Sequence, residues 1–114
     1  RGGLLIQGNT NVIVGEVATL AVDFSADPFL GNAPLEDVDL AAYVSGTATG
    51  EIIYKFDCRN DGIWEKTQVT SSTSYIAYDL CDYSLAGVYT AKVRVERGGA
   101  RVEGMATILV SASQ

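Results

Sequence analysis

Apolar and polar residues alternate along most of this chain, which predicts β-strands rather than helices. In the clearest stretch, every second residue from Tyr89 to Val95 is apolar, and the residues between them are polar or charged. Similar alternation occurs at residues 18–24, 37–42, 52–58 and 101–111, and shorter strand-like runs occur at 63–69 and 75–80. No segment has a helical period, so we expect an all-β domain.

Short turn sequences rich in Gly, Pro, Asn and Asp separate these stretches. The segment from Tyr54 to Cys58 runs into Asn60-Asp61-Gly62 and returns through Ile63, which predicts a tight β-hairpin. Gly98-Gly99 marks a second hairpin turn. We therefore expect seven to eight short strands in two antiparallel sheets packed face to face, which is a β-sandwich.

The chain length of 114 residues fits one domain. Residues 17–112 carry the strand pattern, whereas residues 1–16 are Gly- and Asn-rich around two short apolar patches. We expect residues 1–16 to form a linker or an extra N-terminal edge strand. The single methionine is Met105, so we expect the chain to be part of a longer or processed protein.

Composition narrows the classes of partner and chemistry. The formal net charge of -6 argues against nucleic acid or an anionic membrane as partner, because both attract basic surfaces. No apolar run approaches the roughly 18 residues that a membrane-spanning helix needs. The chain has no histidine, which removes the commonest general base and the usual zinc ligand. Nothing in the sequence pairs a nucleophile with a base, so we expect no enzymatic activity.

Several motifs, in order, resemble the PKD (polycystic kidney disease) domain family of immunoglobulin-like β-sandwich modules. The similar segments are Gly31–Leu35, Tyr54–Asp57, Asn60–Gly62, the Cys81-Asp82-Tyr83 run and Gly87–Tyr89 followed by Val93-x-Val95. The resemblance covers roughly residues 17–112, with Phe56 in place of the family's usual tryptophan and Arg59 where relatives with an acidic loop carry a carboxylate. It implies a sandwich module that accompanies other domains in a larger protein.

The two cysteines are predicted to form a disulfide. Cys58 ends a strand on its inward face, and Cys81 lies just before the passage into the Tyr89 strand, so a sandwich can bring them together. An even cysteine count in a small β-rich chain favours the bond over two buried free thiols, which is the alternative. The bond would indicate an oxidising compartment: extracellular, cell-surface or periplasmic.

Acidic residues raise the question of calcium, the only cofactor that the sequence leaves open. The weak calcium candidates are Asp57, Asn60, Asp61 and Glu65, whose spacing resembles the start of a calcium loop. Arg59 occupies a ligand position and Gln68 replaces the expected bidentate Glu, so we favour a structural Asx-type turn.

A second acidic group comprises Asp27, Glu36, Asp37 and Asp39. We interpret it as an ordinary solvent-facing surface, because alternation places Asp37 and Asp39 on the outer face of their strand.

Trp64, on the return arm of the hairpin, is the best candidate for an exposed ligand contact. Tyr75 and Tyr78 are three residues apart and should face opposite ways on a strand, so a continuous aromatic platform with Tyr83 is not expected. Tyr89, which follows Gly87, suits a corner where the ring is buried and the hydroxyl bonds a loop carbonyl.

The functional expectation is a non-catalytic extracellular or cell-surface module that acts as a spacer or protein–protein interaction domain within a larger protein. Its partners would be neighbouring domains of the same chain or other surface proteins. The alternative is a carbohydrate- or matrix-polymer-binding accessory module of a secreted hydrolase, which would need exposed aromatic residues on one plane.

Overall fold

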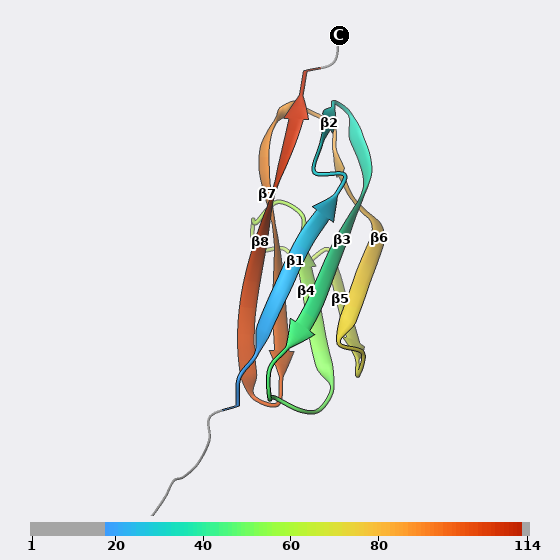
Figure 1. Cartoon of the computed structure of the whole chain (residues 1–114). Coiled ribbons are helices and arrows are strands. Elements are labelled where there is room, and N and C mark those ends of the chain that lie inside the picture. Colours follow the sequence, from blue (N-terminus) through green and yellow to red (C-terminus); the bar gives the residue numbers. More distant parts are fainter. Residues whose placement is uncertain (1–17, 113–114) are drawn as a thin grey trace, which may run out of the picture.

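Two β-sheets pack face to face in this protein, and together they contain eight strands (Figure 1). The computed structural model describes residues 18–112, so the expected linker or edge strand at residues 1–16 lies outside the described residues. Strands make up 68% of the described chain, which contains no helix. The predicted all-β sandwich is confirmed.

The smaller sheet has three antiparallel strands in the order β1-β3-β6. They are β1 (Ala21–Asp27), β3 (Leu35–Ser45) and β6 (Ser74–Tyr83). The β3–β6 pairing shifts register on both sides of Val38, and Asp37 and Asp79 near these shifts have positive φ angles of 61° and 55°. The shifts bend this part of the sheet, as β-bulges do.

The larger sheet has five strands in the order β2-β8-β7-β4-β5. Their bounds are β2 (Leu30–Asn32), β4 (Ile52–Asp57), β5 (Lys66–Thr70), β7 (Gly87–Arg97) and β8 (Ala100–Ser111). All neighbours are antiparallel except β2 and β8, which run parallel. The β7–β8 hairpin is the longest ladder and turns at Gly98-Gly99, as predicted.

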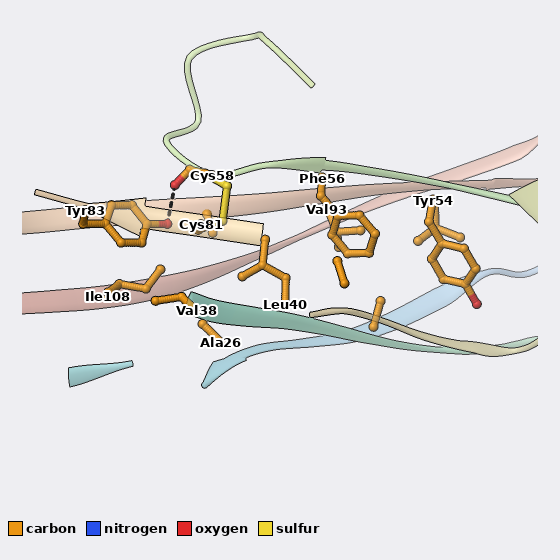
Figure 2. Close-up of a cluster of buried hydrophobic side chains, with 14 of the residues drawn as sticks. Ala26, Val38, Leu40, Tyr54, Phe56, Cys58, Cys81, Tyr83, Val93 and Ile108 are labelled. Carbon is orange, nitrogen blue, oxygen red and sulfur yellow. Dashed lines mark hydrogen bonds between the residues drawn. A yellow bond between two sulfur atoms is a disulfide. The ribbon is translucent and has the colours of Figure 1, made fainter. Parts of the chain in front are cut away.

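The core fills the space between the two sheets with the inward residues of every long strand (Figure 2). Val38, Leu40 and Ala42 of β3 face Phe56 of β4 and Val93 of β7, and all five are fully buried. Because strand side chains alternate between faces, the predicted inward sets of β3, β4 and β7 are confirmed. Their polar neighbours lie on the outer faces.

Three details differ from the sequence prediction. Residues 30–32 lie outside the strand-like runs of the sequence, yet they form β2, and a hydrogen bond from the Leu109 N–H to the Phe29 carbonyl helps to hold this segment to β8. The strand expected at residues 75–80 extends from Ser74 to Tyr83. The hairpin after Asp57 has no tight turn, because residues 58–65 form a longer loop before β5 begins.

The described chain enters and leaves the sandwich at opposite ends of its long axis (Figure 1). β1 begins beside the last residue of β3, Ser45, whereas β8 ends beside β2 at the other end. β8 alone has 12 residues, which corresponds to about 40 Å at about 3.3 Å per residue. Within residues 18–112, no helix is long and apolar enough to cross a membrane.

Candidate functional site

A disulfide between Cys58 and Cys81 ties the two sheets together, as the sequence predicted (Figure 2). Cys58 directly follows β4 of the larger sheet, and Cys81 lies in β6 of the smaller one. Both residues are buried, with exposed fractions of 2% and 1%. The bond therefore crosslinks the sandwich through its core, and disulfides of this kind are typical of proteins in oxidising compartments.

Two tyrosine hydroxyls fasten the loops at the same end of the core. The buried Tyr83 hydroxyl donates to the Cys58 carbonyl over 2.6 Å, and the Tyr89 hydroxyl donates to the Leu85 carbonyl over 2.6 Å. The Tyr89 contact confirms the predicted hydrogen bond to a loop carbonyl, whereas the Tyr89 ring is only half-buried. Burial is the main reason why the pKa of Tyr83 rises to about 12.

The loop formed by residues 58–65 folds around the carboxylate of Asp57. Alternation along residues 52–58 directs this side chain away from the core, yet it is fully buried because the loop covers it. Its Oδ1 accepts hydrogen bonds from the backbone N–H groups of Arg59 (3.1 Å) and Asp61 (3.3 Å), and its Oδ2 accepts one from Gly62 (2.9 Å). A buried carboxylate is tolerated here because three donors satisfy it.

The pKa of Asp57 shows which physical effect prevails at this loop. Burial raises this pKa, but the hydrogen bonds from the Gly62, Arg59 and Asp61 amides lower it by more, and the net pKa is below the ordinary value. The charged form is therefore the one that the fold stabilises.

The fit of this loop to calcium is limited by the same hydrogen bonds. Carboxylate oxygens of Asp57, Asp61 and Glu65, three of the four calcium candidates, lie within 4.8 Å of one another. Glu65 accepts the Cys58 amide over 2.7 Å and Asp61 accepts the Ile63 amide over 3.0 Å, so each acidic residue already holds the loop backbone. We therefore interpret the loop as the Asx-type turn that the sequence analysis favoured over a calcium site.

Trp64 does not offer an open stacking face. It is half-buried, and its ring lies beneath two cations, with Arg94 at 5.1 Å and Lys92 at 5.5 Å from the ring centroid. Both cations project from the outer face of β7. The indole thus covers the sheet beside the acidic loop, and its cation–π contacts account for its position.

The second acidic group lies on the smaller sheet, where it supports the bulged pairing of β3 with β6. The Asp79 amide donates to Asp39 Oδ1 over 2.8 Å, and the Asp37 amide donates to Asp82 Oδ1 over 2.9 Å. Desolvation and the negative charges of Asp37 and Asp39 raise the pKa of Asp79. The structure thus adds Asp79 and Asp82 to the acidic group that the sequence indicated.

Tyrosines also gather on the outer face of this sheet. A trough of about 310 Å³, which we call the tyrosine trough, crosses β1, β3 and β6. Its main lining residues are Asp27, Asp39, Ala41, Tyr43, Ile76 and Tyr78. Tyr43 and Tyr78 are 51% and 70% exposed.

The tyrosine prediction was correct in part. Tyr75 packs inward, 5.7 Å from Tyr54 and 6.0 Å from Phe56 between ring centroids, so Tyr75 and Tyr78 do face opposite ways. Sequence reasoning missed Tyr43, although its place between the buried residues Ala42 and Val44 of β3 already pointed outward.

A second hollow, of about 420 Å³, lies beside the β7–β8 turn. It is lined by Glu51, Ile53 and residues 96–101. Two of its charged groups have partners inside the protein: Arg97 Nε donates to the Gly50 carbonyl over 2.9 Å, and Glu96 lies 3.7 Å from Lys55 Nζ. We assign no ligand to it.

The chain matches no protein-family model and no curated protein.

Proposed function

We propose that this protein is a non-catalytic extracellular module, of PKD type, that acts as a spacer or protein–protein interaction domain in a larger protein. The observation that carries the proposal is the path of the chain, which enters one end of a crosslinked sandwich and leaves at the other (Figure 1). A module of this geometry holds whatever is joined to its two ends at a fixed separation.

The interior supports a mechanical role. The largest buried side chains are apolar or are tyrosines with bonded hydroxyls, and the buried carboxylate of Asp57 accepts three backbone amides. These polar groups form hydrogen bonds to the backbone of the loops, and such satisfied buried networks make a fold more rigid. The disulfide and the Asp57 loop both act on the junction between β4 and β6, so both sheets are expected to move as one body.

A fluorescence experiment tests the spacer role. The full chain is placed between a donor and an acceptor fluorescent protein, and transfer efficiency is compared with that of a Gly/Ser linker of 114 residues. We expect a single narrow transfer population for the module and a broad one for the linker, whose end-to-end distance fluctuates as a coil does. Broad distributions for both fusions would refute the spacer role.

Polymer binding is the second candidate, and the exposed rings of Tyr43 and Tyr78 are the observation in its favour. Trp64 supports it less well than the sequence suggested, because two cations already cover the indole. Sedimentation with insoluble cellulose, chitin and collagen tests it, with Trp64→Ala and Tyr78→Ala as variants. Binding that is lost in Tyr78→Ala would favour this function, and no binding to any polymer would exclude these three ligands.

A further inference from the structure

Charge is divided unequally between the two sheets. The three strands of the smaller sheet carry seven acidic residues and no Lys or Arg. The acidic residues are Asp23, Asp27, Glu36, Asp37, Asp39, Asp79 and Asp82. The Lys and Arg residues of the described chain lie on the larger sheet, apart from Arg59 in the loop after β4.

Two of the six Lys and Arg residues on the larger sheet form ion pairs within the protein. Arg94 Nε lies 2.9 Å from Glu103, and Lys55 Nζ lies 3.7 Å from Glu96. The carboxylates of the smaller sheet have no such partners, since neither ion pair found among residues 18–112 involves β1, β3 or β6. Arg59 approaches this sheet, but its Nη2 donates to the Asp82 carbonyl and its guanidinium lies over Tyr83. The smaller sheet therefore presents a negative field to solvent.

The tyrosine trough lies in the middle of this negative face. Cross-strand register places Asp23 beside Tyr43 at one end, and Ser25 beside Ala41 in the next row of outward residues. Asp27 and Asp39 pair in the row beyond, near Tyr78. Successive outward rows are about 7 Å apart, so the small residues form a floor between two aromatic and acidic walls.

The carboxylates and tyrosine rings of these walls favour binding of a cationic side chain. A Lys or Arg side chain laid in the trough would place its alkyl stem over Ala41 and Ile76, its charged head near Asp27 and Asp39, and a tyrosine ring against the cation. Arg fits best, because its guanidinium can stack on a ring and fork onto a carboxylate at once. A neutral sugar would use the rings but would leave the unpaired negative charge unexplained.

We propose that the tyrosine trough is a docking site for an extended, Arg- or Lys-bearing segment of a protein partner. The inference rests on the proposed interaction role and specifies the surface and the chemistry of the partner. An extended segment projects every second side chain to one side at about 7 Å intervals, which matches the spacing of the outward rows on β3.

Fluorescence anisotropy of a labelled ten-residue peptide with alternating Arg and Ser, titrated with the full chain, tests the proposal. We expect saturable binding that weakens at least tenfold between 50 and 500 mM NaCl, as screened charges require. Each exposed cation–π contact changes affinity by about 2–5-fold, so a Tyr43→Ala/Tyr78→Ala variant should bind roughly 5–25-fold more weakly. Asp27→Asn should weaken binding about 2–5-fold.

Matched controls separate the trough from general charge and apolar effects. Glu51→Gln removes one charge elsewhere, and Val88→Ala removes an exposed apolar side chain from β7; both should leave the affinity unchanged. Because the replaced tyrosines are exposed, the urea midpoint of the double variant should equal that of the parent. A peptide with Gln in place of Arg should not bind.

Four outcomes would overturn the proposal. The first is that Glu51→Gln and Asp27→Asn weaken peptide binding equally, and the second is that the double tyrosine variant binds the peptide as tightly as the parent does. The third is that a neutral hexasaccharide saturates the trough but the Arg peptide does not. The fourth is that the chain associates with itself and thereby blocks the peptide. None of these outcomes affects the fixed end-to-end separation measured by fluorescence transfer, so the spacer role is judged separately.

Discussion

Removing the Cys58–Cys81 bond should destabilise the protein strongly. The bond spans a sequence separation of 23 residues. In the chain-entropy model, a loop of this length in the unfolded state is worth about 3–4 kcal/mol at 25 °C. Domains of this size are stable by about 5–15 kcal/mol in total, so reduction removes a large share of the free energy of unfolding.

The Cys58→Ala/Cys81→Ala variant should lose somewhat more than reduction does. Both cysteines are buried in the core, so each alanine also leaves a small cavity that costs roughly 1 kcal/mol. The expected total is about 5–6 kcal/mol. At about 4–8 °C per kcal/mol, reduction alone should lower the Tm by roughly 12–32 °C.

Urea denaturation with and without a phosphine reductant measures both losses. The double alanine variant is the internal control, because reductant has no bond to break in it and should leave its midpoint unchanged. A loss below about 1 kcal/mol on reduction of the parent protein would refute the chain-entropy reasoning. An equal response of the double variant would show that the reagent, and not the bond, causes the effect.

Three further predictions concern the polar groups and turns that hold the fold. Tyr83→Phe removes the buried hydroxyl bonded to the Cys58 carbonyl and should cost about 1–3 kcal/mol in urea denaturation; a loss below 0.5 kcal/mol would contradict this role. Because folding lowers the pKa of the Asp57 carboxyl, its contribution is present above pH of about 4 and is lost as pH falls through the lower, folded-state pKa. Urea midpoints between pH 7 and pH 2.5 should therefore fall less steeply in Asp57→Asn, and parallel curves would refute the assignment. Gly98→Ala should cost more than Gly99→Ala, since a Cβ at Gly98 would lie 2.7 Å from a backbone oxygen while that at Gly99 meets open space; equal thermal shifts would be inconsistent with this packing.

Alternation alone predicts much of the fold, because long strands with one buried face repeat the same signal many times. The inward sets of β3 and β7 follow from it, and so does the disulfide, once Cys58 is placed at the inward end of β4. The three residues of β2 are too few to show a period, and their pairing with β8 depends on contacts made far along the chain. The loop after Asp57 folds around the buried Asp57 carboxylate, which accepts hydrogen bonds from the loop's backbone N–H groups. No local sequence pattern reveals this arrangement.

The tyrosine trough could be predicted only in part. Tyr43 and Tyr78 can each be assigned to an outer face from their buried neighbours, but two strands, β4 and β5, separate β3 from β6 in the sequence. Strand order brings the two tyrosines and the acidic residues of β1 to one surface, and strand order was not predicted. Strand order also decides which charged residues share a sheet. The excess of acidic residues on the smaller sheet is therefore apparent only once the strands are assigned to sheets.

The most direct test of the interaction role is the location of a bound cationic segment on the molecule. Intermolecular nuclear Overhauser effects between the alternating Arg/Ser peptide and the full chain provide that location. We predict contacts from Arg side-chain protons to the rings of Tyr43 and Tyr78 and to the methyl groups of Ala41 and Ile76. Contacts confined to Trp64 and the larger sheet, or no contacts at saturating peptide, would contradict the account.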